Sequence, residues 1–195
     1  GNPVDMDRLV PLCKKYNVKL IEDCCEALGS KFDKRHVGSF GDLGTFSFYP
    51  SHQINGMGMG GAVVSNNEEY IVKIKSMRAW GKGVYSNKFG GDHLTNYDNK
   101  IDGIPYDDQF SYITNGWNFL MPDVASAYSR VQLSRIEKWN QRRKENWEYL
   151  NDSLKGLPYT PMKVHPKSDP SYFGFAFTMN PEVGQRRDEL SNHLI

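Results

Sequence analysis

The segment that most constrains the fold runs from Thr45 to Gly61 and reads TFSFYPSHQINGMGMGG. Residues 46–49 are typical of a β-strand, and Pro50 ends the strand because proline has no backbone N–H to donate. The polar triplet Ser51-His52-Gln53 follows, and a glycine-rich stretch comes after it. The segment therefore predicts a strand that leads into a turn, with one histidine held between a proline and a glycine-rich loop.

Strand and helix patterns alternate along the rest of the chain. Apolar residues at helical spacing and runs of β-branched or aromatic residues give the expected elements. We expect helices over residues 4–13, 67–81 and 122–154, strands over 18–23, 44–49, 61–66 and 172–180, a polar hairpin or loop at 31–37, and a last helix near the C-terminus. This alternation predicts an α/β fold with a mostly parallel sheet.

The pattern changes twice along the chain. Residues 81–112 are rich in Gly, Asn, Asp and Tyr and have no clean period, which indicates a functional or interface loop. The strand and helix after Pro158 indicate the opening of a second α/β domain. We expect the chain to be an internal part of a longer protein, because it begins without an initiator methionine and stops within a helical pattern.

Composition disfavours several classes of function. Lys and Arg total 24 against 23 Asp and Glu, so the net charge of +1 does not favour binding to nucleic acid. The mean hydropathy is −0.63, and no apolar run approaches the roughly 18 residues of a membrane span. The three cysteines, Cys13, Cys24 and Cys25, do not form a secreted disulfide pattern, so we expect a cytoplasmic protein. The spacing of histidines and cysteines predicts no metal site.

Three features could carry chemistry. Asp23 ends a predicted strand, where open parallel sheets bind ligands, although an aspartate there can also cap a turn. Ser47 and the glycine-rich loop could bind a phosphate, or the loop could be a plain turn. His52 could act as an acid and base near neutral pH, although a lone loop histidine is more often exposed and idle.

Four segments together resemble a known family. LIEDCCEALGS, VGSFGDLGTFSFYPSH, GMGGAVVSNNEE and NGWNFLMPDVASAYSRVQLSRIEKW are similar, in order and spacing, to the sugar aminotransferases of the DegT/DnrJ/EryC1/StrS type. The resemblance implies the fold of aspartate aminotransferase, which is fold type I of the pyridoxal-phosphate enzymes. It implies that residues 1–135 are part of the cofactor-binding large domain and that residues 136–195 are a linking helix and the start of the small C-terminal domain.

The resemblance also assigns roles to single residues. Asp23 matches the aspartate that pairs with the pyridine nitrogen of the cofactor, and Ser47 matches a phosphate-binding serine. Glu26 stands where the family usually has a glutamine near the cofactor ring. Asn118 matches an asparagine that reaches the phosphate in the neighbouring subunit, which implies a homodimer with a shared active site. His52 stands where the aminotransferases have the lysine that links to the cofactor.

A histidine at that position is similar to the branch of the family that dehydrates sugars. This implies a lyase that uses pyridoxamine 5'-phosphate to remove the 3-hydroxyl from a nucleotide-linked 4-keto-6-deoxyhexose, in deoxysugar biosynthesis for O-antigen or other surface polysaccharide. Some relatives carry an iron–sulfur cluster, but residues 81–112 contain no cysteine, so we expect none here. The alternatives are a pyridoxal-phosphate-dependent sugar aminotransferase and a non-catalytic relative of the same fold.

Overall fold

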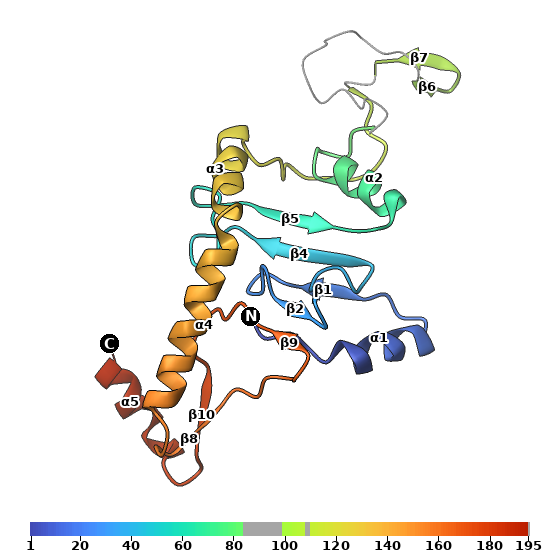
Figure 1. Cartoon of the computed structure of the whole chain (residues 1–195). Helices are drawn as coiled ribbons and strands as arrows, with labels where there is room; N and C mark the ends of the chain where they lie inside the picture. The colour runs from blue at the N-terminus through green and yellow to red at the C-terminus, as the bar shows by residue number, and fades with distance from the viewer. Residues whose placement is uncertain (84–98, 108–109, 195) are drawn as a thin grey trace. The chain divides into compact units, whose positions relative to one another are not determined.

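The computed structural model describes residues 1–83, 99–107 and 110–194 (Figure 1). The chain divides into two compact units. The first consists of Gly1–Val63 and Val124–Ile195, and the second of Val64–Asp123. The domain boundary expected after residue 135 stays a prediction. In the described part of the chain, no helix is long and apolar enough to cross a membrane.

The first unit is built around a three-stranded sheet with the order β1-β4-β5. Strands β1 (Ile21–Asp23) and β4 (Leu43–Ser47) are parallel, with Asp23 opposite Thr45. Strand β5 (Gly61–Val64) lies beside β4, and the arrows of these two strands point in opposite directions in Figure 1. The parallel pairing predicted from the alternating pattern is thus present between β1 and β4, whose carboxyl ends lie at one edge of the sheet.

A second small sheet joins the two ends of this unit. Strands β2 (Lys31–Phe32) and β3 (Arg35–His36) form a hairpin, and β9 (Ser168–Asp169) pairs antiparallel with β2. The turn residues Asp33 and Lys34 both have positive φ, as two-residue hairpins prefer. The polar hairpin predicted at residues 31–37 is confirmed, whereas the pairing with β9 had no local signal.

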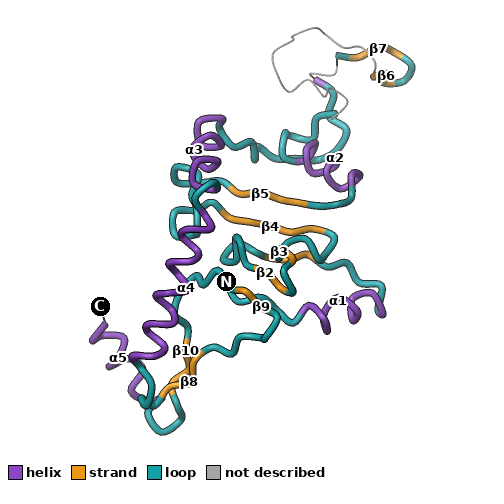
Figure 2. Tube along the Cα trace, viewed as in Figure 1, coloured by secondary structure: helices purple, strands orange, loops and turns teal. Residues whose placement is uncertain are grey.

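The helices differ from the sequence prediction in two places: the helix expected over residues 67–81 covers only Glu68–Met77, and the long pattern expected over residues 122–154 is divided. Helix α1 (Met6–Lys15) begins at Asp5, whose side chain accepts a hydrogen bond from Arg8 N. The single pattern expected over residues 122–154 forms two helices, α3 (Asp123–Leu133) and α4 (Ile136–Ser153), as Figure 2 shows. The break falls at residues 134–135, where a serine and an arginine give no strong sequence signal for a helix end.

The C-terminal part of the first unit contains a two-stranded antiparallel sheet and a short helix. Strands β8 (Tyr159–Pro161) and β10 (Phe177–Met179) pair, and α5 (Arg187–Leu194) follows a single 3₁₀ turn, η2 (Gly184–Arg186). The strand expected over residues 172–180 is therefore wrong in its first half. Arg143 Nη1 donates to the backbone oxygens of residues 172 and 173, so these residues bond to a helix side chain and not to a strand.

The second unit contains one helix and one hairpin in its described residues. Helix α2 (Glu68–Met77) begins at Asn67, whose side chain accepts from Glu69 N. Strands β6 (Asn99–Ile101) and β7 (Ile104–Tyr106) are joined by Asp102-Gly103, both at positive φ. This hairpin falls within the segment expected to be a loop at 81–112, of which residues 84–98 and 108–109 lie outside the described residues.

One buried carboxylate organises the loop between β3 and β4. Glu22 is only 5% exposed, and its two oxygens accept hydrogen bonds from Gly38 N at 2.7 Å, Phe40 N at 2.6 Å and Gly41 N at 2.7 Å. The loop packs tightly onto β4, since a Cβ on Gly44 would lie 2.3 Å from Gly38 O. Glu22 therefore satisfies three backbone donors that close packing keeps from water.

Replacing Glu22 with glutamine should destabilise the protein strongly. The glutamine amide has one oxygen that can accept, but its NH₂ group would face backbone N–H groups, which are also donors. At least one of these backbone N–H groups would then lose its hydrogen-bond partner. We expect Glu22→Gln to lower the free energy of unfolding by about 2–4 kcal/mol, measured by urea denaturation. Glu137→Gln, an exposed change on α4, should stay within about 0.5 kcal/mol of the parent. Equal effects of the two substitutions would contradict this role for Glu22.

Candidate functional site

Asp23 lies at the carboxyl end of β1 with an exposed side chain. Its Oδ1 accepts a hydrogen bond from Cys25 N at 3.2 Å and lies 3.5 Å from the Thr45 hydroxyl. Hydrogen bonds from the side chain and backbone of Cys25 hold the pKa of Asp23 below its ordinary value, and Thr45 and the charge of His52 act in the same direction. The carboxylate is therefore anionic at neutral pH and open to a ligand.

His52 lies in the turn that follows β4. Its backbone N–H donates to Tyr49 O at 3.0 Å, and its ring packs against Tyr49 and Phe173, with ring centroids 6.4 and 5.5 Å away. The Nδ1 atom is buried and has no hydrogen-bond partner among the described residues. Burial separates Nδ1 from a ligand in solution, so proton exchange with a ligand would use Nε2.

Ser47 is the last residue of β4 and is half-buried. Its hydroxyl oxygen accepts a hydrogen bond from Tyr49 N at 3.2 Å, so it fixes the start of the turn that carries His52. A serine hydroxyl that accepts one bond can still donate its own hydrogen, for example to a phosphate oxygen. Phosphate binding by Ser47 stays a prediction.

Glu26 and Gln53 connect the turn after β1 to the turn after β4. The side chain of Glu26 is exposed, and its backbone oxygen accepts a hydrogen bond from Gln53 Nε2 at 2.7 Å. Gln53 is 5% exposed and also donates to Ser171 Oγ at 3.2 Å. Asp23 and Ser47 end two paired strands, Glu26 and His52 lie in the turns that follow them, and Gln53 bonds these two turns together.

Asn118 belongs to the second unit and has an exposed side chain. Its backbone forms an antiparallel bridge with Ala79, and Trp117 N donates to Met77 O at 2.7 Å just after α2. These bonds fix the local path of the chain through residues 117–118. The expected reach of Asn118 into a neighbouring subunit stays a prediction.

Three residues that shape the site were not selected from the sequence. Glu22 could have been found, because side chains alternate along a strand: if Asp23 faces out, its neighbour Glu22 faces the core. Gln53 and Phe173 carried no signal, since Gln53 meets Ser171 across 118 positions and the partner of an aromatic residue cannot be read locally.

Metal ligands do not gather in the described part of the chain, where no group of three or more His, Cys, Asp or Glu side chains could hold a metal ion. The two cysteines beside Asp23 have pKa values raised above the ordinary thiol value, chiefly by burial. The lack of an iron–sulfur cluster in the protein stays a prediction.

Comparison with known proteins gives the family. The model of the DegT/DnrJ/EryC1/StrS aminotransferase family matches residues 1–195. The chain belongs to this family. Over its whole length it is 37% identical to the lipopolysaccharide biosynthesis protein RfbH of Salmonella typhimurium, and equally to the dTDP-4-dehydro-2,6-dideoxy-D-glucose 3-dehydratase of Saccharopolyspora spinosa. Two transaminases match at 31% and 32% identity, one of Streptomyces venezuelae and one of Campylobacter jejuni.

A solved structure of the family has the same fold. The Escherichia coli GDP-4-keto-6-deoxy-D-mannose-3-dehydratase with bound hydrated PLP superposes on the whole chain with a TM-score of 0.81 at 30% identity. The chain spans 48% of that structure, and 45% and 43% of the two sequence relatives. The expected family and the partial fold type I architecture are thus confirmed.

Cys24 gives a test of the packing beside Asp23. Its thiol is 3% exposed, and burial, reinforced by the charges of Glu22 and Asp23, raises its pKa to about 12. At pH 8 only about one thiol in ten thousand is then ionised, and the thiolate is the reactive form. We expect iodoacetamide at pH 8 to modify the half-buried Cys13 first and Cys24 only after unfolding, as followed by mass spectrometry.

The raised pKa of Cys24 also makes the stability of the fold depend on pH. Between about pH 9 and pH 12 the unfolded chain loses the thiol proton while the folded chain keeps it, so this group destabilises the fold as the pH rises through that range.

The alkylation experiment has one contrary outcome. Modification of Cys24 and Cys13 at equal rates in the folded protein would contradict the buried position of Cys24.

Proposed function

We propose that this chain is part of a dehydratase that uses pyridoxamine 5'-phosphate to remove the 3-hydroxyl from a nucleotide-linked 4-keto-6-deoxyhexose, a step toward deoxysugars of surface polysaccharides. The observation that carries the proposal is His52 at the position where the family's aminotransferases have lysine. The proposal includes a homodimer in which Asn118 completes the phosphate site of the neighbouring subunit.

The residues present suit the cofactor chemically. Asp23 is an open carboxylate that is anionic at neutral pH, as a partner of a protonated pyridine nitrogen must be. Ser47 offers a hydroxyl donor for the phosphate, and Glu26 lies in the turn directly after Asp23. When bound, pyridoxamine 5'-phosphate supplies an amine for a keto sugar and a conjugated ring that accepts electrons.

His52 is the proposed acid and base. The burial of Nδ1 leaves Nε2 to accept a proton from carbon and to return it to the departing 3-hydroxyl, which leaves as water. An imidazole suits both tasks because its ordinary pKa lies near neutrality. A lysine at this position would also act as a nucleophile and favour amino transfer, so the histidine favours dehydration.

The runner-up function is amino transfer to a related sugar, which the family description and the transaminase relatives favour. The two reactions give different products from one substrate. With GDP-, CDP- and dTDP-linked 4-keto-6-deoxyhexoses and glutamate, mass spectrometry should show a 3-deoxy product if the proposal is correct. A 4-amino sugar that keeps its 3-hydroxyl would favour the runner-up. A non-catalytic relative would give neither product and would bind no cofactor.

Asp23 should be required for cofactor binding. Asparagine cannot supply the negative charge, and a hydrogen bond to a charged group contributes about 1.5–3 kcal/mol. We expect Asp23→Asn in the complete gene product to bind pyridoxamine 5'-phosphate about 10- to 100-fold more weakly, measured by absorbance titration. Asp188→Asn, an exposed change on α5, is the matched control and should bind as the parent does. Unchanged affinity in Asp23→Asn would remove Asp23 from the cofactor site.

His52 should be required for dehydration but not for cofactor binding. Loss of a general acid and base typically costs 10²- to 10⁴-fold in rate, so we expect about that loss in kcat for His52→Asn. His52→Lys should lose dehydration and gain absorption at longer wavelength with pyridoxal 5'-phosphate, because a lysine can bond to that cofactor. His36→Asn, which changes an exposed histidine on β3, should match the parent. Full dehydration by His52→Lys without the new absorption would contradict the role of His52.

A further inference from the structure

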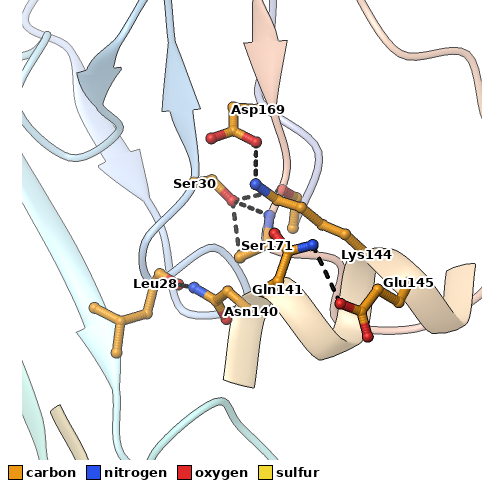
Figure 3. Close-up of polar contacts among 9 residues, drawn as sticks. Leu28, Ser30, Asn140, Gln141, Lys144, Glu145, Asp169 and Ser171 are labelled. Carbon is orange, nitrogen blue, oxygen red and sulfur yellow. Dashed lines mark hydrogen bonds and ion pairs between the residues drawn. The ribbon is translucent and has the colours of Figure 1, made fainter. Parts of the chain in front are cut away.

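Residues Ser168–Phe175, here called the strap, pass between α4 and the turn that carries His52. Helix α4 holds one side of the strap. Arg143 Nη1 donates to Tyr172 O and Phe173 O, each at 3.3 Å. Lys144 forms an ion pair with Asp169 (Figure 3). Two adjacent basic side chains of α4 therefore hold the strap.

Aromatic stacking adds to these bonds. The rings of Trp147 and Tyr172 are stacked, with centroids 4.7 Å apart and planes 6° from parallel. Tyr172 has φ of +23°, in the region that side-chain-bearing residues rarely adopt. Such a conformation persists only where surrounding contacts hold it. It also sets the direction of the backbone at the next residue, Phe173.

The other side of the strap is held by buried hydroxyls. Ser171 is 1% exposed and Ser30 is fully buried; Ser171 N donates to Ser30 Oγ at 2.8 Å, and the two hydroxyl oxygens also lie 2.8 Å apart (Figure 3). Gln53 Nε2 donates to Ser171 Oγ at 3.2 Å. Gln53 is the residue after His52, so the strap is bonded directly to the turn that carries the proposed acid and base.

Nδ1 of the His52 ring has no polar partner among the described residues that would orient the ring. In many sites a carboxylate bonded to one ring nitrogen fixes a catalytic imidazole, but Nδ1 of His52 is buried without any partner among the described residues. The aromatic contacts of the ring are Phe173 at 5.5 Å with planes 47° apart and Tyr49 at 6.4 Å. Tyr49 lies in the same turn, so Phe173 is the contact that comes from elsewhere in the fold.

We infer that Phe173 is a positioning residue, which sets the orientation of the His52 imidazole through ring packing, and that Gln53 holds the strap and the His52 turn in register. This inference rests on the proposed function, because it assigns His52 a proton to move. Misplacing a reacting group by about 1 Å can cost about 100-fold in rate, so packing alone can be decisive.

The test compares two leucine substitutions in the complete gene product. Phe173→Leu removes the ring beside His52, whereas Phe177→Leu removes a ring whose aromatic neighbours in the described structure are Tyr159 and Phe175. We expect Phe173→Leu to lower kcat up to about 100-fold with little change in KM, and Phe177→Leu to lower neither. Phe173→Tyr keeps the ring and should restore kcat.

A second readout does not depend on catalysis. In protein labelled with ¹⁵N-histidine, the ring signals of His52, assigned by their loss in His52→Asn, should move in Phe173→Leu and stay in place in Phe177→Leu. Gln53→Met, which lacks both N–H donors, should move the same signals even if Phe173→Leu does not fold. The inference would be overturned if the ring signals move while kcat and its pH profile stay at the parent values. It would also be overturned if the signals move in neither Phe173→Leu nor Gln53→Met.

These results separate the two proposals. If His52→Asn keeps full dehydration, the proposed function fails whatever Phe173 does. If His52→Asn is inactive while Phe173→Leu has the kcat of the parent, the function stands and the positioning role of Phe173 fails.

Discussion

The carboxylate of Glu22 is the contact on which the arrangement of the site depends. It accepts three backbone N–H groups from residues 38–41, each of which would otherwise be buried without a partner at a cost of about 1–3 kcal/mol. Because strand side chains alternate, a Glu22 that faces inward requires its neighbour Asp23 to face out. The same short strand therefore supplies one carboxylate to the fold and one to the candidate site.

The parallel register of β1 and β4 brings the candidate site residues together. Asp23 pairs with Thr45, so the carboxyl ends of β1 and β4 meet at one edge of the sheet, where ligands bind in open α/β folds. Ser47 follows Thr45 at that edge and fixes the turn that holds His52. The charge of His52 contributes to the lowered pKa of Asp23, which is consistent with a common site for the two residues.

The sequence predicts what depends on neighbours along the chain and misses what depends on distant contacts. The places of Asp23 and His52, at and just after the ends of β1 and β4, follow from the strand patterns, although β4 ends at Ser47 and not at Tyr49 before Pro50. The hairpin at Asp102-Gly103 has a local turn signal, but it lies in a region whose Gly, Asn and Asp content predicts a loop throughout. The late start of β10 at Phe177 has no local signal, because residues 172 and 173 bond to Arg143, about 30 positions earlier.

The contacts of His52 also bear on the chemistry proposed for it. A residue that both accepts and returns a proton needs a pKa near the working pH and a ring held in one orientation. A carboxylate bonded to Nδ1 would orient the ring but would also stabilise the imidazolium, as it does in hydrolytic triads. Packing by Phe173 orients the ring without placing a formal charge beside Nδ1. A histidine held in this way suits elimination, in which the proton taken from carbon must be given up again to the leaving hydroxyl.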